Sequence, residues 1–382
     1  MKTLQIYPRF IHDAQLLEHF EKLGGAERYV FNLCKAQRKL GVDATLMLFG
    51  KENYETHVLG IPVLIHKAKS VFSFINGDFN PLPTNFGRFL SELKKYQIIH
   101  VHNLSSDVAL LVKLNKSVFK TSHKVFVTDH GWKGLTLMRP LLWSCKRLKS
   151  KLILFDGLLT QTTSSFKEYE CFAKVFEPIY GGVDTEKFRP LGVKRKNQVC
   201  FSGRIAPHKG VEGLIEAVSL SKEKPRVVIA GSAINNPYLL FLRELANKLR
   251  VETDFVLYPS DDALAEIYSS SKILVLPSVY TDIYGKYHPN PEGFGLVLVE
   301  AMACELPVVA SKISAISEVV DDNRTGYLVR PRDVGHLCER VDLLLHDYEL
   351  NRKLGIAGRR RVLERFTWSH VARRTLRVYK GC

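Results

Sequence analysis

The segment SGRIAPHKG, residues 202–210, brings together two cations that could bind an anion. Arg204 and Lys209 follow the apolar run QVCFSG and precede a stretch that we expect to be helical from about Gly210. The free amides at a helix N-terminus add to the attraction of such charges for a phosphate. The spacing therefore predicts a diphosphate site, and a solvated pair of surface cations is the alternative interpretation.

The segment PEGFGLVLVEAMA, residues 291–303, carries two acids. Glu292 precedes a Gly-Phe-Gly turn, and Glu300 lies in the helix that we expect after the turn. Carboxylates can accept hydrogen bonds from sugar and ribose hydroxyls without proton transfer. A capping glutamate and a solvated helix glutamate are the alternative, but the stretch LVLVEAMA is too apolar for an acid that binds nothing. The backbone that could approach the same ligand belongs to Phe294, Gly295 and Leu296.

The first half of the chain offers two further candidates. Gly25, in the segment GGAER, opens a helix that we expect to run to about Lys39, and such a helix start can contact a phosphate or a sugar. His130 follows the strand-like run KVFVTD, where its imidazole could orient or polarise a substrate hydroxyl. A loop histidine without a ligand is the alternative. For His100 and His102, in IIHVHN, we favour a role in packing.

No metal or other cofactor is expected. The sequence contains no Asp-x-Asp triplet, which commonly holds a divalent metal on a bound diphosphate. Arg204 and Lys209 would replace that metal, since each can stabilise charge that develops on a leaving phosphate. The seven cysteines are scattered and include no CxxC pair, which indicates reduced thiols in a cytoplasmic protein rather than a zinc site or a disulfide framework.

The formal net charge of +16 favours a polyanionic neighbour. Between Lys113 and Lys151 there are ten basic residues and one acid. Within this stretch, residues 139–152 have the pattern of an amphipathic helix with a cationic face, which is typical of helices that bind an anionic membrane surface. An ordinary domain helix is the alternative. No signal peptide or membrane-spanning run is evident, so we expect a cytoplasmic protein, and the cationic segment would let it bind peripherally to the cytoplasmic face of the membrane.

Short apolar, β-branched runs alternate with helical stretches along the whole chain. The runs are residues 124–129, 198–203, 226–231, 272–278 and 306–311. Such runs are typical of parallel strands that are covered on both faces, so the fold class we expect is α/β, with two doubly wound Rossmann-like domains. Ligands of such sheets bind at the carboxyl ends of the strands, where the candidate residues lie.

We expect the first domain to span residues 1–190 and the second, which would bind the nucleotide, to span residues 191–361. The segment EKFRPLGVKRKNQ interrupts the periodicity and would form the hinge between them. Residues 362–382 have a helical pattern, and we expect this last helix to return to the first domain.

Eight segments together resemble the family 4 glycosyltransferases of the GT-B fold. They are GGAER (24–28), IIHVHN (98–103), TDHG (128–131), GGVDTEKFRP (181–190), GRIAPHKG (203–210), EGFGLVLVEAMA (292–303), PVVAS (307–311) and TGYLV (325–329). The resemblance covers nearly the whole chain. It departs from the family pattern at Gly181, where the family usually has Asn, and at Glu305, where the family commonly has Gly.

The resemblance implies a retaining transferase that moves a hexose-type sugar from a nucleotide diphosphate sugar to a glycan or lipid-linked acceptor. In that scheme Arg204 and Lys209 bind the diphosphate, Glu300 binds the ribose, Glu292 binds the transferred sugar and His130 lies near the reacting centre. A nucleotide-sugar epimerase of the same fold is the nearest rival. The charge also permits a nucleic-acid-binding protein, although we find no helix-turn-helix, zinc module or aromatic RNA-binding motif.

Overall fold

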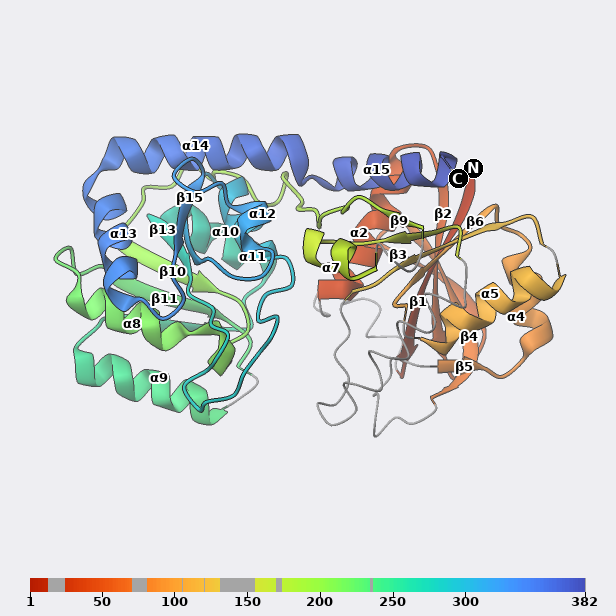
Figure 1. Ribbon diagram of the computed structural model, residues 1–382, viewed down its shortest axis with the longest axis horizontal. Coiled ribbons are helices and arrows are strands. Elements are labelled where there is room, and N and C mark those ends of the chain that lie inside the picture. The colour runs from red at the N-terminus through yellow and green to blue at the C-terminus, as the bar shows by residue number, and fades with distance from the viewer. Residues whose placement is uncertain are drawn as a thin grey trace. The chain divides into compact units, whose positions relative to one another are not determined.

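The computed structural model describes residues 1–12, 25–70, 81–104, 106–119, 121–130, 155–169, 174–233 and 236–381. These residues form two compact units, one made of Met1–Gly181 with Trp368–Cys382 and the other of Gly182–Thr367. Each unit is an α/β structure built on a mainly parallel sheet (Figure 1). The prediction of two doubly wound domains is therefore confirmed.

Unit 1 contains a sheet with the strand order β3-β4-β2-β1-β6-β7-β8-β9, and β5 pairs with β4. All neighbours in this order are parallel except β3 and β4. Its described elements are β1 (Lys2–Ile11), α2 (Gly25–Lys39), β2 (Asp43–Gly50), β3 (Tyr54–Val58), β4 (Ile61–Ser70), β5 (Pro81–Pro83), α4 (Phe86–Leu93), β6 (Ile98–His102), α5 (Asp107–Phe119), β7 (Lys124–Thr128), β8 (Gly157–Leu159), α7 (Thr163–Tyr169), β9 (Val175–Phe176) and α15 (Trp368–Lys380).

Unit 2 contains a fully parallel sheet with the order β12-β11-β10-β13-β14-β15. Its described elements are β10 (Gln198–Ser202), the short 3₁₀ helix η4 (Pro207–Lys209), α8 (Val211–Leu220), β11 (Arg226–Gly231), α9 (Asn236–Leu249), β12 (Thr253–Leu257), α10 (Asp261–Ser270), β13 (Ile273–Leu276), α11 (Leu296–Ala303), β14 (Val308–Ser311), α12 (Ile316–Val319), β15 (Gly326–Val329), α13 (Val334–His346) and α14 (Tyr348–Arg365).

The strand order of unit 2 reverses between β10 and β13, which are neighbours in the sheet although β11 and β12 separate them in the chain. Right-handed connections place α8 and α9 on one face of the sheet and α10 and α11 on the other. In agreement, α8 packs against α9 and α13, and α11 packs against α10 and α14. Ligands of such sheets bind at this reversal, beyond the carboxyl ends of the strands.

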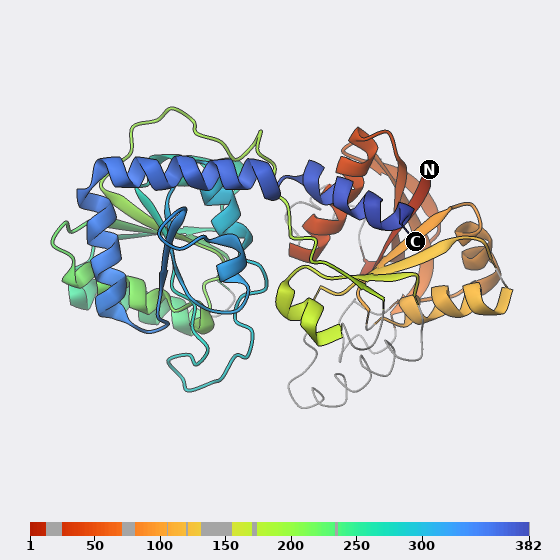
Figure 2. The same cartoon turned by 45° about the horizontal axis from the view of Figure 1, so that its top comes forward.

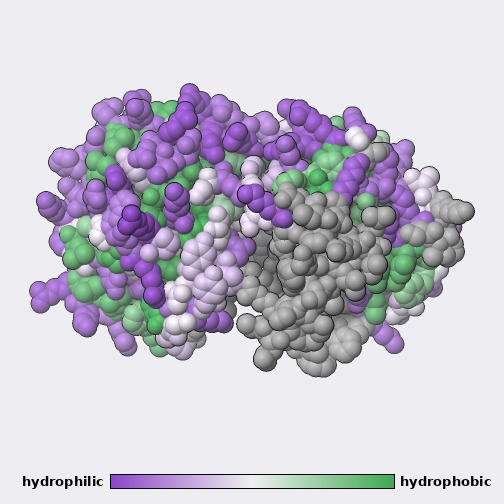
Figure 3. Space-filling view, in the orientation of Figure 1, coloured by the Kyte–Doolittle hydropathy of each residue, from purple (hydrophilic) through white to green (hydrophobic). Residues whose placement is uncertain are grey.

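The last helix, α15, belongs to unit 1, where it lies against α2 (Figures 1 and 2). Val371, Ala372 and Tyr379 of α15 are buried in the same hydrophobic core as residues of α2 and β2. On the face shown in Figure 3, the described surface is mainly hydrophilic and hydrophobic residues form scattered groups. Most large apolar side chains of the described residues are buried in the cores of the two units.

The domain boundaries expected at residues 190 and 361 need correction. The structure places them between Gly181 and Gly182 and between Thr367 and Trp368. Residues 182–190 belong to unit 2 because Phe188 is buried there and Lys187 forms an ion pair of 3.1 Å with Asp261. The long helix α14 also continues to Arg365 before unit 2 ends.

The segment EKFRPLGVKRKNQ, which we expected to form the hinge, also packs on unit 2. Arg195 donates hydrogen bonds to the carbonyl of Glu305, at 2.6 Å, and to Asn351 Oδ1, at 3.0 Å. The backbone of Glu305 has a φ of 57°, in the left-handed region that favours glycine. The bond from Arg195 therefore holds a turn at which the resembling family commonly has glycine.

Candidate active site in unit 2

The ends of β10 and β11 approach so closely that only glycine fits between them. A Cβ atom on Gly231 would lie 1.7 Å from the carbonyl oxygen of Gly203, and both glycines have positive φ values, 155° and 140°. Gly210 also has a left-handed φ of 63°, and a Cβ there would lie 2.3 Å from the carbonyl oxygen of Pro277. These contacts draw the loops after β10, β11 and β13 together at the reversal of the strand order.

Lys209 and Glu292 form a buried ion pair at this edge of the sheet. Lys209 Nζ donates to Glu292 Oε1 at 2.5 Å and to the carbonyl of Pro291 at 3.3 Å. Ser278, which follows β13, donates its hydroxyl to the same carboxylate oxygen at 2.5 Å. Both charged side chains are more than 90% buried. The pair thus joins Lys209, which we expected to bind the diphosphate, with Glu292, which we expected to bind the transferred sugar.

Each member of the pair can still form a further hydrogen bond. An ammonium has three donors, and two of them are used by Glu292 and Pro291. Glu292 Oε2 makes no hydrogen bond within the described part of the chain. Lys209 can therefore meet an anion while Glu292 accepts a hydroxyl, and neither group has to leave its partner.

Arg204 lies two residues after the end of β10, and its side chain is exposed. Among the residues that the structure describes, no carboxylate pairs with this guanidinium. Unlike that of Lys209, its charge is open to an anion from solvent. A planar guanidinium with several donors binds phosphate oxygens in a bidentate manner.

Helix α11 places the remaining candidates of unit 2. Gly295 is its N-cap, with a φ of 82°, and Leu296 is its first residue. Phe294 is buried against Phe366, with ring centroids 5.7 Å apart, so its side chain packs in the core and only its backbone could serve a ligand. Glu300 is 7% exposed and accepts a hydrogen bond from the Tyr268 hydroxyl at 3.3 Å. Burial raises the pKa of this tyrosine well above its ordinary value, so it stays a donor.

The loop before Glu292, residues 279–290, forms a closed turn around Asp282. Asp282 Oδ1 accepts from the amides of Tyr284 and Lys286, and Oδ2 lies 2.8 Å from His288 Nε2. These bonds lower the pKa of the nearly fully buried Asp282 despite its burial. The His288 ring also lies 4.9 Å from the ring of His208, which precedes Lys209 in η4. The loop is thereby fixed beside the ion pair.

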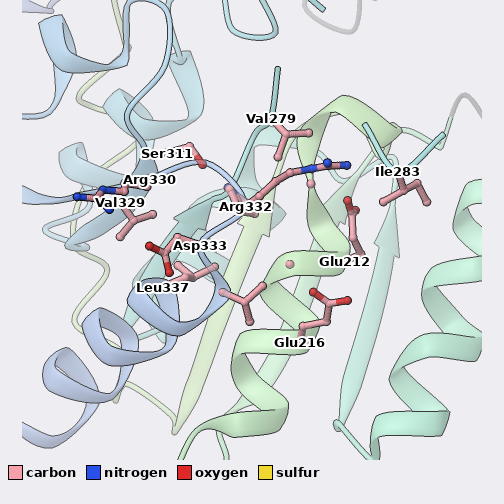
Figure 4. A pocket seen from close by; sticks show the side chains of 14 residues that line it. Glu212, Glu216, Val279, Ile283, Ser311, Val329, Arg330, Arg332, Asp333 and Leu337 are labelled. Carbon is pink, nitrogen blue, oxygen red and sulfur yellow. The ribbon is translucent and has the colours of Figure 1, made fainter. Parts of the chain in front are cut away.

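A pocket of about 280 Å³ lies between the N-terminal ends of α8 and α13 (Figure 4). Glu212 and Glu216 of α8 and the guanidinium of Arg332 border it. Arg332 donates to the carbonyl of Asp282 at 2.9 Å, which fastens the closed turn from this side. None of the site residues expected from the sequence lines this pocket.

Unit 1 holds the other two candidates. Gly25 is the first residue of α2, and its neighbour Gly24 lies outside the described residues. His130 follows β7, and both of its ring nitrogens are engaged: Nε2 lies 3.0 Å from His102 Nδ1, and Nδ1 lies 3.2 Å from Gln161 Nε2. Burial lowers the pKa of His130 to about 4, so the ring is neutral near pH 7. A substrate hydroxyl would have to displace the Gln161 amide.

The structure also changes the interpretation of His100 and His102. Both side chains are fully buried, yet each forms two hydrogen bonds at distances of 2.6 to 3.0 Å. They belong to a polar network rather than to simple packing. Their partners Gln5 and Tyr379, and Gln161, which bonds to His130, come from distant segments, and no sequence motif marks them.

Some expectations concern residues that the structure does not describe. The cationic segment 139–152 is among them. In the described ranges no three His, Cys, Asp or Glu side chains are grouped so that they could hold a metal ion. No helix in the described part is both long enough and apolar enough to cross a membrane.

Comparison with known sequences places both units in one group of proteins. The family described as "Glycosyltransferase Family 4" matches residues 23–187, and the family described as "Glycosyl transferases group 1" matches residues 183–361. Among individual relatives, an alpha-maltose-1-phosphate synthase of Mycolicibacterium smegmatis is 34% identical over 220 residues, 54% of this chain and 54% of that protein.

A second relative is the GDP-mannose-dependent alpha-(1-6)-phosphatidylinositol monomannoside mannosyltransferase of Mycobacterium tuberculosis. It is 29% identical over 281 residues, 68% of this chain and 70% of that protein. The chain spans about half the length of the first curated relatives it matches, from 46% to 58%.

Solved structures share the fold over the whole chain. HepE of Anabaena, solved in complex with UDP, superposes with a TM-score of 0.75 at 17% identity and is covered completely. Sucrose-phosphate synthase of Thermosynechococcus elongatus superposes with a TM-score of 0.69 at 20% identity, and 99% of it is covered. At these identities the likeness concerns the fold.

Proposed function

Because this chain belongs to the group 1, family 4 glycosyltransferases of the GT-B fold, we propose that it transfers a hexose-type sugar from a nucleotide diphosphate sugar to a glycan or lipid-linked acceptor. Such a reaction would serve the synthesis of a cell-surface polysaccharide or glycolipid. The product keeps the anomeric configuration of the donor. No divalent metal takes part in the transfer.

The observation that carries this proposal is the Lys209–Glu292 pair at the reversal of the unit 2 sheet. A buried cation and carboxylate that share one hydrogen bond can meet a phosphate and a sugar hydroxyl side by side. The exposed Arg204 adds a second cation for the diphosphate, and Glu300 offers a carboxylate to the ribose. Gly295 and Leu296 present the first amides of α11 to the same ligand.

The relatives support a sugar nucleotide as donor but do not select its base. The mycobacterial mannosyltransferase is named for GDP-mannose, and the structures of HepE contain UDP or UDP-glucose. Binding measurements with several sugar nucleotides would identify the base and the sugar. An acceptor linked to lipid is supported by the cationic stretch between Lys113 and Lys151, which would bring the enzyme to an anionic membrane surface.

The first experiment is a calorimetric and thermal-shift screen of UDP, GDP, ADP and their common sugar conjugates. Wild type should bind one nucleotide, and Arg204→Ala and Glu300→Ala should each bind it about 10-fold to 100-fold more weakly, because each loses charge-assisted hydrogen bonds. Arg360→Ala and Glu266→Ala remove one exposed charge of the same type from α14 and α10 and serve as controls.

Three results would contradict parts of this proposal. Binding of no nucleotide by wild type would contradict the donor site. Product of inverted configuration in an NMR analysis of the new linkage would contradict retention. Loss of activity in a chelator, with recovery on addition of magnesium or manganese, would contradict a metal-independent mechanism.

A further inference from the structure

A chain of buried hydrogen bonds in unit 1 connects His130 with the last helix of the protein. His130 Nε2 lies 3.0 Å from His102 Nδ1, and His102 Nε2 lies 2.9 Å from Gln5 Oε1. The amide nitrogen of Gln5 donates to the hydroxyl of Tyr379 on α15, at 3.3 Å, and to Gln37 Oε1, at 3.0 Å. The side chains of Gln5, Gln37, His102 and Tyr379 are almost completely buried, so water cannot replace these partners.

The direction of each bond follows from the chemistry of the groups. Gln5 uses its amide nitrogen for Gln37 and Tyr379, so it meets His102 with its carbonyl oxygen, which can only accept. His102 must therefore carry its proton on Nε2. Burial lowers the pKa of His102 well below its ordinary value, so the ring is neutral and its Nδ1 is an acceptor.

The acceptor on His102 determines what His130 can do. With His102 Nδ1 as acceptor, His130 has to donate from Nε2, and the neutral His130 ring then has its lone pair on Nδ1. This nitrogen faces the amide nitrogen of Gln161 at 3.2 Å, which agrees with a lone pair at that position. The ring of Tyr29 packs edge-on against both histidines and limits their rotation.

We propose that His102 is a positioning residue that holds His130 in a single tautomer, with the proton on Nε2 and the lone pair on Nδ1. Gln5, which is tied to Tyr379 of α15, holds His102 in turn. His130 then presents to the substrate an acceptor for a sugar hydroxyl, and Gln161 occupies that acceptor until the substrate arrives. The role in catalysis rests on the proposed function, whereas the tautomer does not.

The tautomer can be measured on the whole protein without any substrate. Selective ¹⁵N labelling of the 13 histidines and a long-range ¹H–¹⁵N correlation spectrum show which ring nitrogen carries the proton, and a His130→Asn spectrum identifies the signals of His130. Wild-type His130 should show a protonated Nε2 and an unprotonated Nδ1. A proton on Nδ1 of His130, or a mixture of both forms, in the wild-type spectrum would overturn the proposal.

Two substitutions of His102 separate positioning from mere packing. His102→Asn can keep an acceptor toward His130, because Asn Oδ1 stands where His Nδ1 stood, whereas His102→Leu removes it. His130 should keep its tautomer in His102→Asn and become a mixture in His102→Leu. His66→Asn serves as the control, because it removes another buried histidine of unit 1, one that lies in β4 and bonds to the carbonyl of Lys67.

The same variants give a kinetic test once a donor and an acceptor are known. In His102→Leu we expect kcat to fall about tenfold, the effect of one lost hydrogen bond, with His102→Asn within about threefold of wild type. Equal loss of activity in both variants, or an unchanged tautomer in His102→Leu, would contradict the positioning role. Absence of transferase activity in wild type would contradict the proposed function and leave the result from the spectra intact.

Discussion

At the scale of single residues, the candidate site depends on buried charges that are matched in pairs. Lys209 and Glu292 are both more than 90% buried, and each supplies the partner that makes the burial of the other tolerable. Ser278 adds a hydrogen bond to the same carboxylate. These residues of the candidate site are thus also structural residues of unit 2, and their substitution should change stability as well as any binding.

We expect Lys209→Met to lower the free energy of unfolding by about 3 kcal/mol, because it leaves Glu292 buried without its cation. Glu292→Gln keeps an acceptor for Ser278 and should cost less. In the double variant, Glu292→Gln should restore at least about 1 kcal/mol of the unfolding free energy that Lys209→Met loses. Urea denaturation of wild type, the two single variants and the double variant measures this coupling. Strictly additive effects would show that the two side chains are not coupled.

The histidines of unit 1 should make stability depend on pH. Burial lowers the pKa of His130 to about 4 and that of His100 to about 3, from an ordinary value of 6.5. The unfolded chain therefore binds more protons than the folded one below pH 6.5, so stability is complete above 6.5 and is lost as the pH falls toward 4 and 3. Each histidine should contribute a slope of at most about 1.4 kcal/mol per pH unit.

Denaturant titrations from pH 7 to pH 4 measure this slope. In His130→Asn it should be smaller than in wild type by the contribution of one histidine. A His130→Asn curve parallel to that of wild type would mean that the folded protein accommodates the protonated imidazole.

At the scale of elements, the site depends on how closely the strand ends approach one another. A methyl group on Gly231 would overlap the carbonyl of Gly203 and disturb the loop that carries Arg204. We expect Gly231→Ala to destabilise unit 2 by about 3 kcal/mol, since neither the backbone carbonyl nor the positive φ can adapt cheaply.

Gly213→Ala is the matched control. Gly213 lies in α8, and a Cβ there meets nothing within 4 Å, so the substitution should stabilise the protein by about 0.5 to 1 kcal/mol. Urea unfolding monitors both variants. Similar stabilities of the two variants would show that the loops after β10 and β11 are not held in contact.

At the scale of the whole molecule, the chain completes its first unit only with its last helix. Val371, Ala372 and Tyr379 of α15 fill a core that α2 and β2 cannot close alone. A protein that ends at Thr367 should therefore show faster amide exchange in α2, while exchange in α11 of unit 2 stays as in the full chain. Unchanged protection of α2 would show that unit 1 folds without α15.

The sequence by itself determined the class of fold and most of the candidate residues, because these depend on local patterns. Apolar runs of strand length predicted β7, β10, β11, β13 and β14. The cations of GRIAPHKG and the acids of PEGFGLVLVEAMA follow strands or open a helix, so their place at the carboxyl edge of the sheet could be predicted from spacing. Glu305, where the resembling family commonly has Gly, indeed has a left-handed backbone with a φ of 57°.

Only the tertiary structure decided which of these side chains bond to one another. The pairing of Lys209 with Glu292 and Ser278 joins three segments of unit 2. The bonds that lead from His130 through His102 and Gln5 to Tyr379 join segments far apart in the chain, since Gln5 and Tyr379 are separated by 374 positions. The unit boundaries at Gly181 and Thr367 likewise depend on where Phe188 and α15 are buried. Such contacts depend on geometry between distant segments, which no local spacing encodes.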